Sequence, residues 1–478
     1  MERLIQIIFL ILVNISVAAC SSADYNNGEI SDKEIAEIIS RTTPVYNEYC
    51  SGCHESDIKE FSNGNFIHGK NPESIYQSIA EGRNSGEMPS FKDAFSDAQI
   101  KDMVITILHS ANTLANFDLK LSGTDSEVYE SRHFNFKLKK VIDEISSPWG
   151  MAFLPEGGFL VTDKSGELYR VNKLNQKIKI KGVPSVKYRS QGGLMDVELH
   201  PNFKENGFIY LSFTAFDKND DDLTTTAVSR YKLIDDELRE EKQIFIALPF
   251  VDSGVHFGSR LEFDDKGYLY ITIGDRGQRD THPQDLSTYP GKVHRVNDDG
   301  TIPSDNPYVN NNTAISSIYS YGHRNPQGMR KNPNTGEIWT HEHGPRGGDE
   351  INIIKPGLNY GWPVISYGIN YSGTKFTELT EKEGMEQPFH YWTPSIAPSG
   401  MEFVKGDIYP GWEGDLLVGS LSFRFLGLYE IEGDKLVREE RLLMDMGRVR
   451  NVKQGPDGYI YVAFEDPGII YKIVPIND

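Results

Sequence analysis

The stretch KGYLYITIGD, residues 266–275, contains a pattern that recurs through most of this 478-residue chain. Gly267 suits a tight turn, and the alternating hydrophobic run after it is typical of a β-strand. The same turn glycine and strand return at Gly158, Gly207, Gly336, Gly414 and Gly458. Six copies of one strand type predict a repeat architecture.

The distance between copies indicates which repeat architecture this is. The separations are irregular, but each exceeds what one blade of four short strands needs. A β-sandwich or a barrel would also contain many strands, yet neither predicts one strand type at blade-sized intervals. We therefore predict a six-bladed β-propeller over residues 133–478, with the strand around Phe134 to Val141 a candidate to close the ring beside the C-terminal strands.

Composition restricts the partners of the chain. Its 69 Asp and Glu residues outnumber 49 Lys and Arg residues, for a formal net charge of -20. No basic run is long enough to follow a phosphate backbone, so nucleic acid is a poor partner. The length exceeds that of one ordinary hydrophobic core, which favours a large domain and a small one.

The first 20 residues have the features of an export signal. An apolar run from Leu4 to Val13 follows the charged start and is too short for a convincing spanning helix. The small residues before Cys20 resemble a bacterial lipobox, which implies a lipidated Cys20, a polar tether over 21–30, and a membrane-anchored protein on the periplasmic side. A plain signal peptide with an incidental cysteine is the alternative.

The segment EYCSGCHE, residues 48–55, contains Cys50, Cys53 and His54. The chain has three cysteines in total, so after Cys20 too few remain for a four-cysteine zinc site. Two thiols in an exported protein could form a redox disulfide, but the histidine directly after the second thiol favours covalent haem c. We predict that Cys50 and Cys53 bind the porphyrin and that His54 ligates the iron.

Residues 31–112 are predicted to form a small all-α domain. Ser31 with Glu34, and Ser96 with Gln99, are capping boxes that begin helices, and Pro72 opens another. Five apolar residues after Ser96 fall at helical spacing and predict one buried stripe: Ile100, Met103, Val104, Ile107 and Leu108. A polar linker over 113–132 would separate this domain from the propeller.

Met88 is the predicted second ligand of the haem iron. It lies in the loop Gly86-Glu87-Met88-Pro89, where a thioether can point inward. Met103 is a rival that its apolar stripe assigns to the core, and His68 or His109 would give bis-histidine ligation. The CxxCH near the start and the Met-Pro late in the domain resemble class I cytochromes c, which implies a domain that accepts electrons.

Four stretches of the β-rich part place polar residues where a simple propeller needs only turns. They are GVHFGSRL at 254–261, IGDRG at 273–277, YGHRNPQG at 321–328 and EHGPRGGDEIN at 342–352. Together they resemble the soluble glucose/sorbosone dehydrogenases, closest to the aldose sugar dehydrogenase branch, from about residue 135 to the C-terminus. The resemblance implies a propeller enzyme that oxidises sugars with pyrroloquinoline quinone (PQQ).

The resemblance also implies that His256 is the catalytic base and that Asp275 supports it. Oxidation of a sugar hemiacetal removes a hydroxyl proton while a hydride leaves the same carbon, and a neutral imidazole suits that proton transfer. A carboxylate beside the ring would orient it and stabilise the imidazolium.

PQQ carries three carboxylates, for which guanidinium groups are suitable partners. Seven residues match the family's contacts to the quinone: Gln191, Arg324, Asn325, Gln327, Tyr371, Arg448 and Arg450. One departure is Ser422, which stands where close family members have a lysine. Either Arg424 supplies the missing charge or the pocket holds PQQ less tightly.

The same comparison implies two calcium sites. The carbonyl groups of Gly344 and Pro345 match those that hold an ion against the quinone, where it acts as a Lewis acid. Glu350 and the carbonyl group of Tyr360 match a second, structural site. The two histidines of HEH at 341–343 could instead suggest zinc, but the sequence marks no third ligand.

Together these features predict an exported quinohaem dehydrogenase. An aldose-type sugar would be oxidised at C1 through PQQ and calcium, and electrons would pass to the internal haem c and then to an external cytochrome or respiratory acceptor. The alternative is a non-catalytic propeller that binds a ligand and carries an electron-transfer cytochrome. The loops from Tyr371 to Tyr391 do not select a particular sugar.

Overall fold

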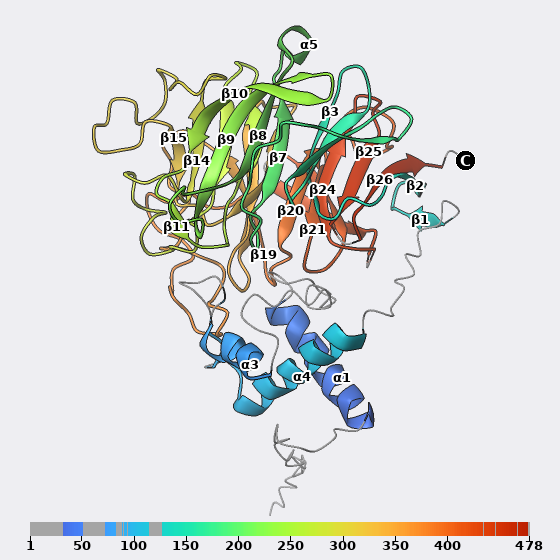
Figure 1. Ribbon diagram of the computed structural model, residues 1–478, viewed down its shortest axis with the longest axis vertical. Coiled ribbons are helices and arrows are strands. Elements are labelled where there is room, and N and C mark those ends of the chain that lie inside the picture. Colours follow the sequence, from blue (N-terminus) through green and yellow to red (C-terminus); the bar gives the residue numbers. More distant parts are fainter. Residues whose placement is uncertain are drawn as a thin grey trace, which may run out of the picture.

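The structure is a computed structural model that describes residues 32–50, 72–82, 88, 90–92, 94–113 and 127–476, except 434, 445 and 466. A ring of β-sheets forms the larger part, and helices lie below it in Figure 1. Among the residues described, no helix is long and apolar enough to span a membrane. The predicted signal, Cys20 and the tether over 21–30 fall outside these residues.

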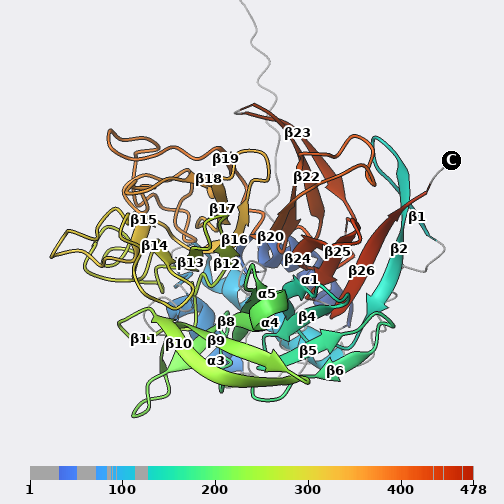
Figure 2. The same ribbon diagram turned by 90° about the horizontal axis from the view of Figure 1, so that it is seen from above.

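Six antiparallel sheets form the ring, which confirms the predicted six-bladed propeller (Figure 2). Blade 1 contains β3 (Pro148–Phe153), β4 (Phe159–Asp163), β5 (Glu167–Val171) and β6 (Lys177–Lys179). Blade 2 contains β7 (Leu194–Leu199), β8 (Phe208–Phe216), β9 (Leu223–Ile234) and β10 (Glu237–Ile246), with the short β11 (Val251–Asp252) paired to β9. Blade 3 contains β12 (Leu261–Phe263), β13 (Leu269–Ile273), β14 (Lys292–Val296) and β15 (Ile318–Tyr321).

The remaining blades follow the same plan. Blade 4 contains β16 (Pro326–Lys331), β17 (Ile338–Glu342), β18 (Asp349–Ile354) and β19 (His390–Trp392). Blade 5 contains β20 (Pro398–Phe403), β21 (Leu416–Ser420), β22 (Leu426–Glu432) and β23 (Lys435–Leu442). Blade 6 contains β24 (Val449–Gln454), β25 (Ile460–Phe464) and β26 (Ile469–Pro475), and is completed by β2 (Asn135–Ile142) and β1 (Val128–Glu130).

The six repeat strands seen in the sequence have one common place in the fold. Each is the second strand of its blade: β4, β8, β13, β17, β21 and β25. The glycine before each strand has a positive φ, from 66° at Gly207 to 87° at Gly414. Since side chains disfavour that conformation, the turn between the first and second strands of every blade explains the recurring glycine.

The ring closes by pairing a strand from before blade 1 with the last strand of the chain. β2 runs antiparallel to β26, with Leu138 opposite Ile473, as the segment around Phe134 to Val141 led us to expect. β1 pairs with β2 and lies inside the segment 113–132 that we expected to be linker. The propeller therefore begins earlier than the predicted boundary at 133.

The helical unit contains α1 (Asp32–Tyr49), α3 (Pro72–Glu81) and α4 (Asp97–Thr113). Before α4, the backbone N–H of Ser96 donates to Oε1 of Gln99 at 2.9 Å, and that of Gln99 donates to Oγ of Ser96 at 3.3 Å, which is the predicted capping box. Met103 on α4 is 1% exposed, so it belongs to the core as its spacing predicted. The capping box at Ser31 lies outside the described residues.

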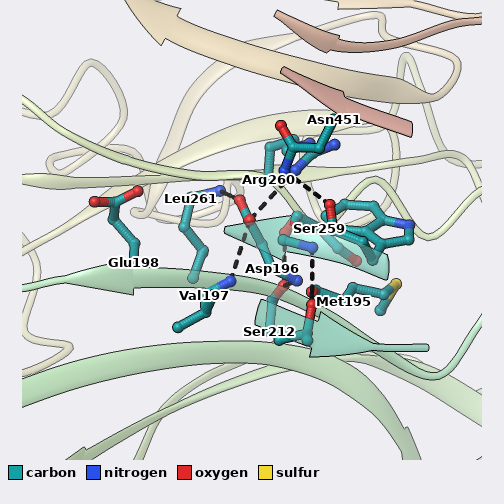
Figure 3. A network of polar contacts seen from close by, with 12 residues as sticks. Met195, Asp196, Val197, Glu198, Ser212, Ser259, Arg260, Leu261 and Asn451 are labelled. Atoms are coloured by element: carbon teal, nitrogen blue, oxygen red, sulfur yellow. Dashed lines mark hydrogen bonds and ion pairs between the residues drawn. The ribbon is translucent and has the colours of Figure 1, made fainter. Parts of the chain in front are cut away.

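A buried network around Arg260 connects the blades at their first strands (Figure 3). The guanidinium donates hydrogen bonds to the carboxylate of Asp196 at 3.3 Å, and to the carbonyl groups of Gln327 at 2.6 Å and Arg450 at 3.4 Å. It also lies 3.9 Å from the ring centroid of Trp149. These partners belong to blades 1, 2, 4 and 6, and Arg260 itself directly precedes blade 3, so one side chain links blade 3 to four other blades.

We predict that Arg260→Ala lowers the free energy of unfolding by about 3–5 kcal/mol, because Asp196 is then left buried without its cation. The midpoint of urea unfolding measures the loss. Arg239→Ala is the matched control, since Arg239 and Glu237 form an exposed pair at 2.7 Å on β10. Such pairs contribute about 0–1 kcal/mol, and equal shifts in the two variants would contradict the role of Arg260.

Candidate active site

Loops between the blade strands enclose two adjoining cavities on the side of the propeller that faces the helices. Cavity A has a volume of about 450 Å³ and cavity B of about 390 Å³. Both are lined by His256, Arg324, Pro345 and Tyr371. These four predicted site residues come from four different loops, and the fold brings them together where the cavities meet.

Two other polar features of the described residues do not bring predicted site residues together. An open depression of about 700 Å³ lies beside α5 (Phe203–Asn206), but its Arg170 is paired with Asp236 at 2.5 Å. The acidic residues 220–222 form a cluster on the surface, where Lys187 pairs with Asp221 at 2.8 Å. Cavities A and B are therefore the candidate active site.

His256 and Asp275 form a buried pair at the centre of this site. Nδ1 of His256 lies 2.6 Å from Oδ1 of Asp275, whose side chain is 1% exposed. The carboxylate also accepts hydrogen bonds from the backbone N–H of Gly277 and from Nε1 of Trp362, both at 2.8 Å. Because an ionised carboxylate only accepts, Nδ1 carries the proton, and Nε2 keeps its lone pair.

The backbone at His256 is held in a sparsely populated conformation, with φ of 54°. The backbone N–H of His256 donates to Oε1 of Gln191 at 2.9 Å. Nearby, the buried Arg276 donates hydrogen bonds to the carbonyl groups of Ser253 and Val255 and lies 3.4 Å from the ring centroid of Phe257. These contacts hold the loop, and so they fix the direction of the imidazole.

The electrostatic surroundings favour a neutral histidine beside an ionised aspartate. Burial, and next the charge of Arg324, lowers the pKa of His256 below its ordinary value of 6.5, against the opposing charge of Asp275. Burial alone would raise the pKa of Asp275, but its contacts with His256, Arg324 and Trp362 hold it below its ordinary value of 3.8. A neutral imidazole is the form that can accept a proton.

The seven residues expected to contact the quinone fall into two groups. Gln191, Arg324 and Tyr371 line cavity A. The other four are buried and are not among the residues that line either cavity: Asn325, Gln327, Arg448 and Arg450.

Arg448 and Arg450 share a carboxylate that the sequence analysis missed. Nη2 of Arg450 lies 2.7 Å from Oε2 of Glu465, and Nε of Arg448 lies 3.8 Å from the same atom. Although burial alone would raise it, the pKa of Glu465 is held well below its ordinary value by Arg450, Lys164 and Arg448. Glu465 directly follows β25, so its place at the end of a repeat strand was a signal that could have identified it.

Arg324 connects the proton-accepting pair to the predicted calcium carbonyls. Its Nη1 donates hydrogen bonds to the carbonyl groups of His343 at 3.0 Å and Gly344 at 2.6 Å. The carbonyl group of Pro345 accepts a hydrogen bond from Oγ of Ser395 at 2.9 Å. Gly344 and Pro345 both line cavity A, so their carbonyl oxygens border the space where the quinone is expected.

The residues of the predicted second calcium site lie in an acidic, buried environment. Burial, and next the charge of Glu342, raises the pKa of Glu350 well above its ordinary value. Nδ2 of Asn352 donates to Glu342 at 3.1 Å and to Glu350 at 3.3 Å, and its buried Oδ1 accepts no hydrogen bond from the described residues. A cation would satisfy this excess of oxygen atoms, and calcium prefers such ligands.

Two further expectations concern single residues. Ser422 lines cavity A together with Phe423, whereas Arg424 is not among the residues that line it. Nε2 of His343 lies 2.7 Å from the carbonyl oxygen of Pro398, and among the described residues neither histidine of the HEH segment belongs to a group of three metal-binding side chains. The zinc alternative therefore has no support from the described part of the chain.

The helical unit contributes to the cavities, which the sequence analysis did not anticipate. Asn47 and Tyr49, near the end of α1, line cavity A, and Ser90 lines cavity B. Contacts between two domains depend on surface shape and leave no periodic pattern in the sequence.

Only part of the predicted haem site can be located. Cys50 and Met88 pack against one hydrophobic cluster of the helical unit. Cys50 directly follows Tyr49, and Met88 lies two positions before Ser90, so each is close in the chain to a residue that lines a cavity. Cys53, His54 and the rival His68 lie outside the described residues.

Comparisons with known proteins agree with both parts of the structure. Residues 38–105 match the family model described as cytochrome C oxidase, cbb3-type, subunit III, which confirms the predicted cytochrome c domain. Aldose sugar dehydrogenase YliI from Escherichia coli (strain K12) is 44% identical over 344 residues, which span 70% of this chain and 92% of that protein.

Two solved structures are similar to the propeller. The soluble aldose sugar dehydrogenase from Escherichia coli, in its apo-form, has 40% identity and a TM-score of 0.68, and the match covers 71% of this chain and 100% of that one. The PQQ-bound form of aldose sugar dehydrogenase from Streptomyces coelicolor has 25% identity and a TM-score of 0.59, over 71% and 97% of the two chains. Residues 145–472 match the family model, and the chain therefore belongs to the glucose/sorbosone dehydrogenase family.

Proposed function

We propose that this sugar dehydrogenase oxidises aldoses at C1 with PQQ and calcium, and passes the electrons through its own haem c to an external acceptor. Family membership and the cytochrome domain make the chain a sugar oxidoreductase with an electron-transfer domain. The observation that carries the proposal is the His256–Asp275 pair, because it lies in cavities lined by both domains.

His256 is the proposed base. With Nδ1 held by Asp275, Nε2 can take the proton from the C1 hydroxyl group of the sugar. PQQ, when bound, supplies the acceptor for the hydride that leaves C1, so the aldose becomes a lactone. Asp275 then stabilises the imidazolium that the proton transfer creates.

The charges around cavity A suit PQQ. Arg324 lines the cavity, and the buried Arg448 and Arg450 lie beside Glu465 on blade 6. Guanidinium groups suit a cofactor with three carboxylates. The PQQ-bound relative from Streptomyces coelicolor supports the same cofactor for this chain.

Calcium fits both groups of residues that the family comparison indicates. The carbonyl groups of Gly344 and Pro345 border cavity A, and each oxygen has a second lone pair beyond the hydrogen bond that it accepts. Glu350 lies beside Glu342 and the unsatisfied Oδ1 of Asn352. We propose that the first pair holds an ion at the quinone, and that Glu350 with the carbonyl group of Tyr360 holds a structural ion.

Haem c is the proposed route by which electrons leave. Each sugar oxidation releases two electrons, but a haem takes one at a time, so it must deliver the first to the external acceptor before it receives the second. The positions of Cys50 beside Tyr49 and of Met88 near Ser90 support a short path, since Tyr49 and Ser90 line the cavities. Met88, Cys53 and His54 complete the proposed ligand set.

The proposal includes export and anchoring. The signal-like residues 1–20 and the lipobox resemblance support lipidation of Cys20, with attachment to a membrane on the periplasmic side. The external acceptor would then be a cytochrome or another respiratory component.

Haem reduction by sugar tests the whole proposal. We expect that protein loaded with haem, PQQ and calcium shows the absorption band of reduced haem when glucose is added without oxygen. Dye reduction without haem reduction would contradict the internal transfer. If calorimetry shows no saturable binding of PQQ to the apo-protein, the non-catalytic alternative is correct instead.

A variant without covalent haem provides the control. Replacement of both Cys50 and Cys53 by Ala should leave dye-linked sugar oxidation intact and abolish transfer to an acceptor cytochrome. Loss of both activities would mean that the domains depend on each other more than we propose.

Asp275→Asn tests the proton transfer. We expect kcat to fall by about 10²–10⁴-fold, because the imidazolium loses its carboxylate. Removing that negative charge also lowers the pKa of His256 further, so the acidic limb of the kcat/KM profile, below pH 6.5 in the parent protein, should move to lower pH. Asp285→Asn, an exposed change in the same loop, should alter neither, and an unchanged profile in Asp275→Asn would remove Asp275 from the mechanism.

Glu350→Gln tests the structural calcium. Without PQQ, calcium should raise the thermal unfolding midpoint of the parent protein, since it binds only the folded state. The variant should lose this rise, whereas Glu378→Gln, at an exposed residue paired with Lys375, should keep it. A full calcium response in Glu350→Gln would contradict the site.

A further inference from the structure

We propose that the helical unit forms the outer wall of the substrate cavities and restricts the enzyme to short aldoses, with Tyr49 as a specificity-determining residue. The inference rests on the proposed function and adds to it a substrate class. The wall combines residues of the helical unit, Asn47, Tyr49 and Ser90, with Arg346 and Tyr371 of the propeller.

Tyr49 is held between the two domains. Its ring lies against the helical core, with centroid distances of 4.8 Å to Phe95 and 6.5 Å to Phe91. From the propeller, the guanidinium of Arg346 lies 4.2 Å from the Tyr49 ring centroid, within the range of a cation–π contact. Tyr49 therefore has partners in both domains and lines cavity A.

Arg346 connects this contact to the loop that carries Tyr371. The backbone N–H groups of Arg346 and Ile369 each donate to the carbonyl group of the other at 3.0 Å. Tyr371, two residues further on, lines both cavities and also packs against the hydrophobic core of the helical unit. The helices, the Tyr371 loop and the catalytic cavities therefore meet at one place.

The wall has a consequence for substrate size. The side chain of His256 is 13% exposed and borders both cavities, so a sugar must present C1 from inside them. Cavity B, of about 390 Å³, is near the lower end of the range of about 300–1,000 Å³ for small-molecule sites. A longer sugar would extend from C1 toward Ser90, Tyr371 and Tyr49 and meet the helical unit.

Polar groups of cavity B suit a single sugar ring. Arg279 donates to Oδ1 of Asn370 at 3.0 Å, and Asp280, Thr281 and Ser372 also line this cavity. Hydroxyl, carboxylate, amide and guanidinium groups together match the hydroxyl groups of a sugar. These polar groups belong to the propeller, and Ser90 adds a residue of the helical unit to the lining.

Sugars of increasing length test the restriction in the full-length holoenzyme. Glucose, maltose and maltotriose have the same reducing-end ring, and we expect kcat/KM to fall by about tenfold or more along this series. Arg346→Ala should reduce this discrimination, measured as the ratio of kcat/KM for glucose to kcat/KM for maltotriose. Equal kcat/KM for the three sugars in the parent protein would overturn the proposal.

Paired variants separate a lost wall from a damaged fold. Tyr49→Phe keeps the ring and Arg346→Lys keeps the cation, so both should retain the parent discrimination, whereas Tyr49→Ala should lose it. Covalent haem content and circular dichroism show whether the helical unit of Tyr49→Ala remains folded. If Arg346→Ala and a folded Tyr49→Ala both discriminate as the parent does, the helical unit does not set substrate size.

Thiol labelling tests the wall without any sugar oxidation. Ser372→Cys places a thiol in the lining of cavity B, and the parent chain reports the background from its own cysteines. The thiol should react with iodoacetamide but slowly with a polyethylene glycol maleimide, and Arg346→Ala should speed the second reaction. If Ser372→Cys alone reacts fast with both reagents, the proposed wall is wrong. If it reacts slowly with the maleimide but the protein oxidises no sugar, the wall stands and only the proposed function is contradicted.

Discussion

The guanidinium of Arg260 is the interaction on which the rest of the propeller depends. Blades of a propeller contact mainly their neighbours, but this side chain, directly before blade 3, contacts residues of four other blades at once. Burial lowers the pKa of Arg260 to about 10, so it stays charged at neutral pH, held by Asp196 and the face of Trp149. Its carbonyl partners are Gln327 and Arg450, which are also expected cofactor residues, so the packing of the blades and the cofactor site share one network.

The active site repeats this use of buried charge. The loops before β12 and after β13 bring His256 to Asp275, and the paired strands β24 and β25 bring Arg448 and Arg450 to Glu465. Arg276 holds the His256 loop through the carbonyl groups of Ser253 and Val255. Two neighbouring sequence motifs therefore contact each other in the fold. GVHFGSRL contains His256, and IGDRG contains Asp275, which pairs with His256, and Arg276, which holds the His256 loop.

Local chemistry explains which features the sequence predicted. The six repeat strands were identifiable because each follows a turn that needs glycine, and Met103 was assigned to the core because helical spacing placed it there. Trp362 was missed as a partner because its contact joins positions far apart: Trp362 is 87 residues from Asp275. Glu465 is only 15 residues from Arg450, and its position directly after a repeat strand was a signal that the sequence analysis did not use. The contact of Tyr49 with Arg346 was also missed, since one aromatic ring and one arginine at a domain surface form no pattern.

The closure of the ring by β2 and β26 has a consequence for the order in which the protein becomes functional. Almost the whole propeller lies between β2 and β26 in the sequence. The sheet that these two strands complete also contains β24, which begins directly after Arg448. During synthesis, the helical unit and the first five blades emerge while the partner of β2 is still missing. The full set of residues that would hold the quinone, Arg448 and Arg450 included, therefore comes together only when the last blade is complete.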